Sequence, residues 1–270
     1  MDLIYGRNPR QTFLYFLHGL SEIAAYEQMA LRYFGSKGWF KEKLDELVPE
    51  DTKILVAPFL GSGKAELHLA KRRPELTVLG SDIFEPLVNF HQRLQDGSLV
   101  ESLQKWVGSS LDKEEYREML QKMDDAATFF MVMRHNFHGK FGSYSKACDL
   151  TKRTTDTLAK LQMPNFIVER RDALDAIRNA PQGSVIFADP PYFFRKRGKY
   201  YAQSKGDLEF QKELAEALKE RGLPFVVCTN DEPEVLKLYE GCTFRVYPHA
   251  CRTSKIHTKH YNEIAVTHGL

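Results

Sequence analysis

The chain has 270 residues, of which 43% are hydrophobic and 27% are charged, and its formal net charge is +2. This composition is typical of a globular protein with one sizeable domain, or with a domain that carries an insertion, and it excludes disorder throughout the chain. Four cysteines without a C-x-x-C pair exclude a disulfide scaffold and a zinc ribbon. No apolar stretch reaches about 18 residues and no signal peptide is apparent, so we expect a cytoplasmic protein that does not span a membrane.

The first hundred residues predict helices and strands in alternation. Apolar spacing predicts a helical extension over residues 1–30 and a short helix over 37–47. An apolar run over 54–59 is typical of a buried strand and is closed by Gly61-Ser62-Gly63. A helix over 64–73, a strand over 76–81 that ends at Asp82, and a helix over 85–95 follow. Strand, glycine turn, helix, strand and acid in this order are typical of a nucleotide-binding βαβ unit.

Residues 98–165 interrupt the alternation, which then resumes. The interruption predicts helices over 116–123, 126–133 and 151–161, around a loop over 135–144. Strands are expected over 166–170, 185–188, 224–228, 244–247 and 262–266, with helices over 173–179, 208–221 and 233–239. Gly63 and Asp189 lie 126 positions apart, whereas three βα units need only about 90 residues. We therefore predict a Rossmann-like α/β sheet from residues 31–97 and 166–270, with residues 98–165 as a mainly helical insertion.

The most specific segment is Asp189-Pro190-Pro191-Tyr192, directly after a predicted strand. Parallel α/β sheets bind their ligands at the carboxyl ends of strands. The prolines fix the backbone and remove two donors, which leaves carbonyl acceptors beside the carboxylate, and Tyr192 offers a ring for stacking. Such a site suits an amine on a flat base, with Asp189, Pro190 and Tyr192 as catalytic residues. The alternative is a strand end that prolines stop and an aspartate caps.

A second motif consists of Phe59, Gly61 and Gly63, with Asp82 after the next strand. Glycines let the backbone approach a ligand, and an acid at this place suits the two hydroxyls of a ribose. Glu66 occupies the last position of a G-x-G-x-x-G pattern, which disfavours a dinucleotide. An ordinary tight turn between strand and helix is the alternative interpretation.

Together the two motifs resemble those of S-adenosylmethionine-dependent amino methyltransferases. Their order is similar to that of the Dam-type adenine-specific DNA methyltransferases, over about residues 31–267. The resemblance implies a class I methyltransferase sheet with an inserted target-recognition domain, S-adenosylmethionine as cofactor and no metal. Residues 32–37 resemble the family's Lys-Trp-x-Gly-Gly-Lys, which implies that Tyr33 and Lys37 contact the cofactor. Asp82 falls on the family's ribose-binding acid, and Asp189 on the acid that contacts both cofactor and target amine.

Contacts with DNA are expected from two segments. The stretch 134–144 resembles the family's Arg-His-Gly-Tyr-Asn-Gly, which implies DNA contacts at Arg134, Asn136 and Lys140. A basic run follows Tyr192 closely and is expected at the rim of the pocket, where it would bind phosphates; it comprises Arg195, Lys196 and Arg197. A solvated loop is the alternative for this run. Asp172 either contacts the cofactor's adenine or caps the following helix.

The function expected from this resemblance is methyl transfer to the exocyclic amine of adenine in duplex DNA, with the base extruded from the helix. Methylation of RNA adenine or of DNA cytosine remains open, and so does a catalytically silent protein that binds nucleic acid. The oligomeric state, the recognised sequence and the existence of a cognate restriction enzyme are also left open.

Overall fold

A computed structural model of the chain describes residues 31–33, 35–193, 207–252 and 258–270. The predicted helix over residues 1–30 lies outside the described residues. So do Arg195, Lys196 and Arg197.

The core of the molecule is a seven-stranded sheet with the order β3-β2-β1-β4-β5-β7-β6. Five strands run parallel: β1 (Ile54–Ala57), β2 (Thr77–Asp82), β3 (Phe166–Arg170), β4 (Val185–Ala188) and β5 (Phe225–Asn230). The last two form a hairpin, in which β7 (Thr258–His268) pairs antiparallel with both β5 and β6 (Thr243–Arg252). The predicted α/β class and Rossmann-like sheet are confirmed.

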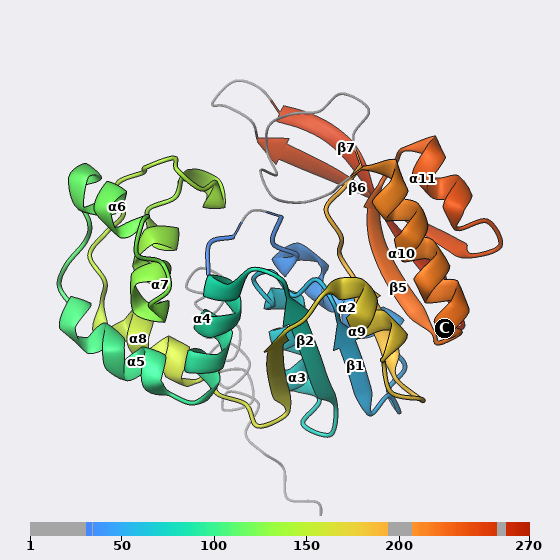
Figure 1. Cartoon of the computed structure of the whole chain (residues 1–270), viewed down its shortest axis with the longest axis horizontal. Helices are drawn as coiled ribbons and strands as arrows, with labels where there is room; N and C mark the ends of the chain where they lie inside the picture. Colours follow the sequence, from blue (N-terminus) through green and yellow to red (C-terminus); the bar gives the residue numbers. More distant parts are fainter. Residues whose placement is uncertain (1–30, 34, 194–206, 253–257) are drawn as a thin grey trace, which may run out of the picture.

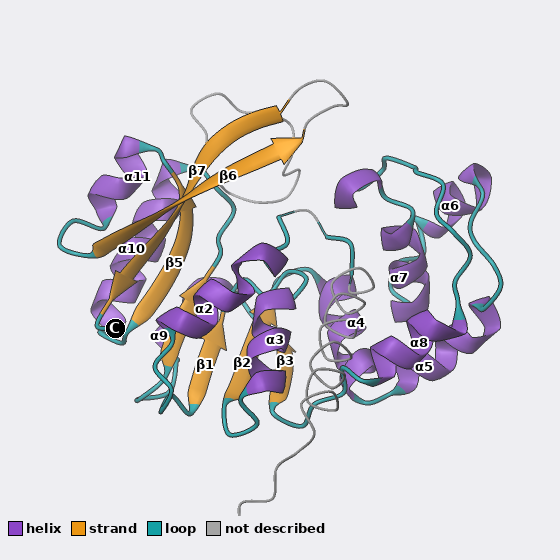
Figure 2. Cartoon of the chain, turned by 180° about the vertical axis from the view of Figure 1, so that it is seen from behind, coloured by secondary structure: helices purple, strands orange, loops and turns teal. Residues whose placement is uncertain are grey.

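Helices cover both faces of this sheet (Figures 1 and 2). The first face carries α2 (Lys41–Leu47), α3 (Lys64–Arg72) and α4 (Glu85–Gln95), preceded by the 3-10 turn η1 (Gly38–Phe40). The second face carries α9 (Ala173–Arg178), α10 (Leu208–Arg221) and α11 (Pro233–Leu238). Successive strand residues alternate between the two cores: Leu55 and Phe187 lie in the first, Val56 and Ile186 in the second. Burial on both faces explains why these strands are apolar throughout.

Between α4 and β3 the described chain is helical, as the sequence predicts. The elements are α5 (Ser98–Leu103), η2 (Gln104–Trp106), α6 (Lys113–Met119), α7 (Ala126–Arg134), η3 (Phe137–Gly139) and α8 (Lys152–Ala159). Phe90 of α4 stacks on Phe130 of α7 with centroids 6.0 Å apart, and Phe129 lies 6.1 Å from the same ring. The hydrophobic core of this insertion is therefore continuous with the first face of the sheet.

Helix α6 and strands β6 and β7 differ most from their predicted boundaries. Helix α6 begins at Lys113, three residues before the predicted start, because Asp112 and Glu115 form a capping box. Strands β6 and β7 are about twice as long as predicted, since their outer halves pair with each other beyond the sheet and need no apolar pattern. The hairpin and the insertion both rise on the side where the parallel strands end (Figure 2). No helix in the described ranges is long and apolar enough to cross a membrane.

Candidate active site

The carboxyl ends of three parallel strands bring the predicted site residues to one edge of the sheet. Asp82 is the last residue of β2, Asp189 follows β4 directly, and Asn230 ends β5. The antiparallel strand β7 reaches the same edge from the opposite direction, which places Glu263 beside Asn230. Two groups of side chains result, one around the glycine loop 59–63 and one around Asp189.

In the glycine loop, backbone donors are fixed by a carboxylate. Gly61 and Gly63 have φ angles of 51° and 63°, a conformation that favours glycine. The carboxylate of Asp82 accepts hydrogen bonds from the Gly61 N–H at 3.1 Å and from the Phe84 N–H at 3.0 Å. Burial raises the pKa of Asp82, and these N–H groups oppose the rise. The loop is therefore tied to the end of β2.

A buried histidine holds the other side of this loop. Nε2 of His91, on α4, lies 2.9 Å from the Gly61 carbonyl oxygen. A carbonyl only accepts, so Nε2 carries a hydrogen. Burial lowers the pKa of His91 to about 4. A Cβ atom on Gly63 would lie 3.2 Å from Cε1 of this ring, so the histidine also limits what the loop tolerates.

These residues fit the cofactor that the resemblance implies. A Cβ atom on Gly61 would lie 3.7 Å from the Tyr33 ring, so glycine keeps the space between loop and ring open. Each carboxylate oxygen of Asp82 uses one described hydrogen bond and has a second lone pair for a ribose hydroxyl. Ile83, next to it, is 67% exposed and offers an apolar surface. Asp82 and the loop backbone are the groups that would hold S-adenosylmethionine.

Around Asp189 the contacts are between charged side chains. The Lys37 ammonium lies 2.8 Å from Asp189 Oδ1 and 2.9 Å from Glu263 Oε1, and it also donates to the Gly35 carbonyl at 3.4 Å. The ammonium therefore lies between two carboxylates and one carbonyl. Lys37, predicted to contact the cofactor, thus contacts the predicted catalytic acid directly, and its contact with the cofactor stays a prediction.

Tyr192 completes this group. Its hydroxyl donates a hydrogen bond to Glu263 Oε1, and Lys37 Nζ lies 4.8 Å from the centroid of its ring. Burial, followed by the charges of Asp189 and Glu263, raises the pKa of Tyr192. The phenol therefore stays protonated and acts as a donor.

The group as a whole carries negative charge. Burial disfavours the charge of Lys37, but Asp189 and Glu263 outweigh it and keep the pKa of the ammonium above its usual value. Burial raises the pKa of Asp189 to about 6, with Lys37 opposing and Glu263 adding to the rise. Burial also raises the pKa of Glu66, on α3, to about 8, so this acid is neutral at pH 7. One ammonium thus faces two carboxylates, which favours positive charge on a bound group.

Two amides fix the turn that carries Tyr192. The Gln211 side chain on α10 donates to the Pro191 carbonyl at 2.9 Å, and Asn230 donates to the Phe193 carbonyl at 2.6 Å. Along the chain, the Pro190 carbonyl comes before the Pro191 and Phe193 carbonyls that these amides bind. It is the acceptor next to Asp189 that the sequence assigns to the target amine.

Two predicted cofactor residues lie apart from these groups. The Phe59 ring packs edge-on against Phe210 of α10, with centroids 6.1 Å apart. The Asp172 carboxylate accepts from the Leu174 N–H at 2.9 Å at the start of α9, which is the capping role considered as its alternative. A cofactor contact of either residue stays a prediction.

In the insertion, two of the three predicted DNA contacts have internal roles. Asn136 is 1% exposed, and its side chain accepts from the Tyr116 hydroxyl and lies 3.1 Å from Met133 Sδ. The Arg134 guanidinium donates to the Cys148 carbonyl at 3.1 Å. The buried amide of Asn136 does not fit a contact with DNA, whereas Arg134 is half-buried and its DNA contact stays a prediction. Lys140 is exposed on this loop and its DNA contact stays a prediction.

Three residues of this edge were not predicted from the sequence. Glu263 precedes the apolar run 264–266, and an acid in a buried strand is the signal that was available. His91 lies among the apolar residues of α4, and Glu66 was considered only as a mismatch to a motif. An ionisable residue on an apolar face is usually a core residue, so none of the three could be chosen without the fold.

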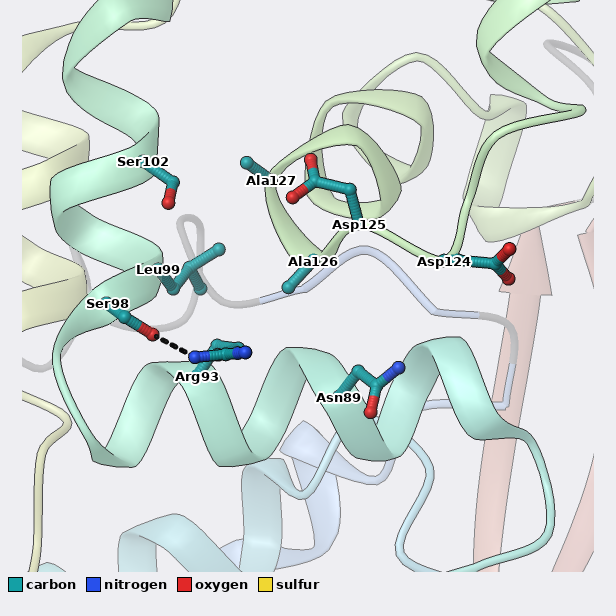
Figure 3. Close-up of a pocket in the computed structure, with 9 residues that line it drawn as sticks. All are labelled: Asn89, Arg93, Ser98, Leu99, Ser102, Asp124, Asp125, Ala126 and Ala127. Carbon is teal, nitrogen blue, oxygen red and sulfur yellow. Dashed lines mark hydrogen bonds between the residues drawn. The ribbon is translucent and has the colours of Figure 1, made fainter.

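A separate cavity of about 340 Å³ lies between α4, α5 and α7 (Figure 3). It is lined by nine residues that include none of the site residues predicted above: Asn89, Arg93, Ser98, Leu99, Ser102, Asp124, Asp125, Ala126 and Ala127. Asp125 accepts from the Thr128 N–H and caps α7, and Arg93 donates to the Ser98 hydroxyl at 3.4 Å. Within the described ranges, no group of three or more His, Cys, Asp or Glu is placed to hold a metal ion.

Comparisons with known proteins give two relatives in sequence and one similar structure. The chain is 26% identical over 258 residues to a DNA N-6-adenine-methyltransferase of Escherichia phage P1, which covers 86% of this chain and 33% of that protein. It therefore spans only a third of that relative's length. It is 24% identical over 241 residues to a DNA adenine methylase of Escherichia coli K12, which covers 80% of this chain and 85% of the relative. A precorrin-6y C5,15-methyltransferase from Geobacter metallireducens aligns at 10% identity with a TM-score of 0.45, over 87% of this chain and 89% of that structure.

A family model described as D12 class N6 adenine-specific DNA methyltransferase matches residues 33–254. The match covers more than half of the chain and includes the glycine loop, the insertion and the Asp189 motif. The chain therefore belongs to the D12 class of N6 adenine-specific DNA methyltransferases.

Proposed function

We propose that this protein transfers a methyl group from S-adenosylmethionine to the exocyclic amine of adenine in duplex DNA, at specific sites and with the base extruded from the helix. The observation that carries the proposal is the buried carboxylate of Asp189 at the carboxyl end of β4, in a group with more negative than positive charge. Family membership and the two named relatives support adenine as the target and DNA as the polymer. DNA as the substrate and the three described free thiols support the expected cytoplasmic location.

The residues around Asp189 suit this reaction. The bound cofactor supplies an electrophilic methyl group on its sulfonium sulfur. The Asp189 carboxylate and the Pro190 carbonyl accept hydrogen bonds from the target amine, which directs its lone pair to the methyl carbon. Positive charge that develops on the amine nitrogen during methyl transfer would be stabilised by the Asp189 and Glu263 carboxylates, and the methylated amine would then release one proton to solvent. Tyr192 stacks on the extruded base.

The test is incubation of the protein with donor labelled in the methyl group and with DNA or RNA, followed by identification of the methylated nucleoside. N6-methyldeoxyadenosine from duplex DNA alone is expected. Label in RNA or in cytosine would assign the alternative substrates, and the absence of label, with donor still bound, would identify a silent binding protein. Asp189→Asn is the matched inactive control.

Binding of duplex DNA can be tested by substitutions in the basic run that follows Tyr192. Replacing Arg195, Lys196 and Arg197 together with alanine is expected to weaken DNA binding equally across sequences. It should also reduce the salt slope by about 0.9 for each phosphate that the protein no longer neutralises. Titrations at several salt concentrations measure this slope, and an unchanged value would assign the run to a solvated loop.

A further inference from the structure

Glu263 is a buried carboxylate that the proposed reaction uses only through its charge. It lies on β7, pairs with Asn230 of β5 and Tyr247 of β6, and is 3% exposed. Neither of its strand neighbours along the chain contributes to the site, so its presence at this edge depends on the antiparallel pairing with β5. A buried carboxylate is costly unless it is paired.

One oxygen of Glu263 serves two partners from different parts of the chain. Oε1 lies 2.9 Å from Lys37 Nζ and accepts the Tyr192 hydroxyl hydrogen. Lys37 precedes η1, whereas Tyr192 follows β4, so this single atom joins two segments that are far apart in the sequence. The same ammonium also lies over the Tyr192 ring.

Because Lys37 is shared with Glu263, it neutralises the Asp189 carboxylate only in part. Lys37 alone would form a one-to-one ion pair with Asp189 and neutralise the acid that must attract the target amine. With Glu263 as a second partner at nearly the same distance, the positive charge of Lys37 is divided between two carboxylates. Among the described residues, the other titratable groups that act on this site are Cys228 on β5 and Glu66 on α3, and burial raises the pKa of both, so both are neutral at pH 7.

We propose that Glu263 is a positioning residue: it orients the Tyr192 ring through its hydroxyl and divides the Lys37 charge, so that Asp189 keeps a net attraction for the target amine. This role rests on the proposed methyl transfer. It also implies that the base stacks on a ring whose rotation is restrained at one end by Glu263 and on one face by Lys37.

The first test is the pH dependence of turnover in Glu263→Gln. The amide keeps the shape and an acceptor for Tyr192 but removes the charge. Loss of that charge lowers the pKa of Asp189, because Glu263 now contributes to its rise to about 6. The acid limb of the kcat profile should therefore shift to lower pH, while kcat falls by up to about 10²-fold and donor affinity is unchanged. Glu240→Gln, at an exposed position after α11, is the control.

The second test is a double-mutant cycle of Glu263→Ala and Tyr192→Phe, measured both in kcat and in the free energy of unfolding. If Glu263 acts through the Tyr192 hydroxyl, the double variant is less impaired than the sum of the single variants predicts. Additive effects, or an acid limb that does not move in Glu263→Gln, would overturn the positioning role. Coupling in unfolding, together with no methyl transfer by the unsubstituted protein, would overturn the proposed function instead.

Discussion

The two halves of this site are built in different ways. The cofactor side consists of the glycine loop, Asp82 and His91, which lie close together along the chain and are joined by hydrogen bonds to backbone. The target side joins Lys37, Asp189 and Glu263 from three distant segments through their charges. The residues of the first half belong to one βαβ unit and the helix that follows it, whereas those of the second come together only when the whole sheet is assembled. Substitutions in the two halves should therefore affect different properties: methyl transfer on the target side, and stability and donor binding on the cofactor side.

The largest effect is expected on the target side. Asp189→Ala removes the main acceptor of the target amine and should lower kcat by about 10² to 10³-fold, while donor binding changes much less. Rapid-quench measurement of methyl transfer at saturating donor gives this number. Asp156→Ala, at an exposed position of α8, should transfer methyl groups normally. Near-normal turnover in Asp189→Ala would remove this residue from the mechanism.

The pH dependence of stability tests the role of His91 on the cofactor side. Its pKa lies near 4 in the folded protein and near 6.5 when unfolded, so between these values the unfolded chain binds more protons. The stability that the neutral ring contributes is present above pH 6.5 and is lost as the pH falls towards 4, by up to about 3 kcal/mol. His91→Phe should flatten this part of the stability curve, as measured by urea unfolding. Equal slopes in both proteins would mean that His91 titrates normally.

Substitution of Asp82 tests whether the cofactor side contacts the methyl donor. Charged hydrogen bonds contribute about 1.5–3 kcal/mol, so Asp82→Ala should weaken donor binding at least tenfold in calorimetry. Because Asp82 also accepts the Gly61 and Phe84 N–H groups, the variant should unfold at a lower temperature without donor. Asp82→Asn keeps an acceptor and should lose less of both. An unchanged affinity would exclude a ribose contact.

The smallest effects concern the insertion, where Asn136 and Lys140 differ in burial. Asn136→Ala removes the side-chain acceptor of the Tyr116 hydroxyl and should lower the free energy of unfolding by about 1–3 kcal/mol. Lys140→Ala should lower stability less than Asn136→Ala and should alter DNA affinity or site preference in binding titrations. The reverse result for the pair would restore Asn136 as a DNA contact and make Lys140 structural.

The contrast between the local cofactor side and the long-range target side explains which features the sequence could predict. Nearly all strands and helices were predicted, because parallel strands buried on both faces leave apolar runs and glycine turns mark their ends. Gly61, Asp82 and Asp189 follow from strand ends in the sequence. Glu263 does not, because its place depends on β7 pairing between β5 and β6, a long-range event without a local pattern. Asn136 was predicted to contact DNA only because its segment resembles a family motif. Its burial, which the sequence does not reveal, distinguishes an internal amide from a surface amide.

The position of β7 also bears on how the protein is made. It lies between β5 and β6 in the sheet but follows both along the chain. While the chain emerges from the ribosome, β5 therefore has an unpaired edge, and β6 has no partner, until β7 has been synthesised. The residue that completes the site, Glu263, arrives with the strand that closes that edge.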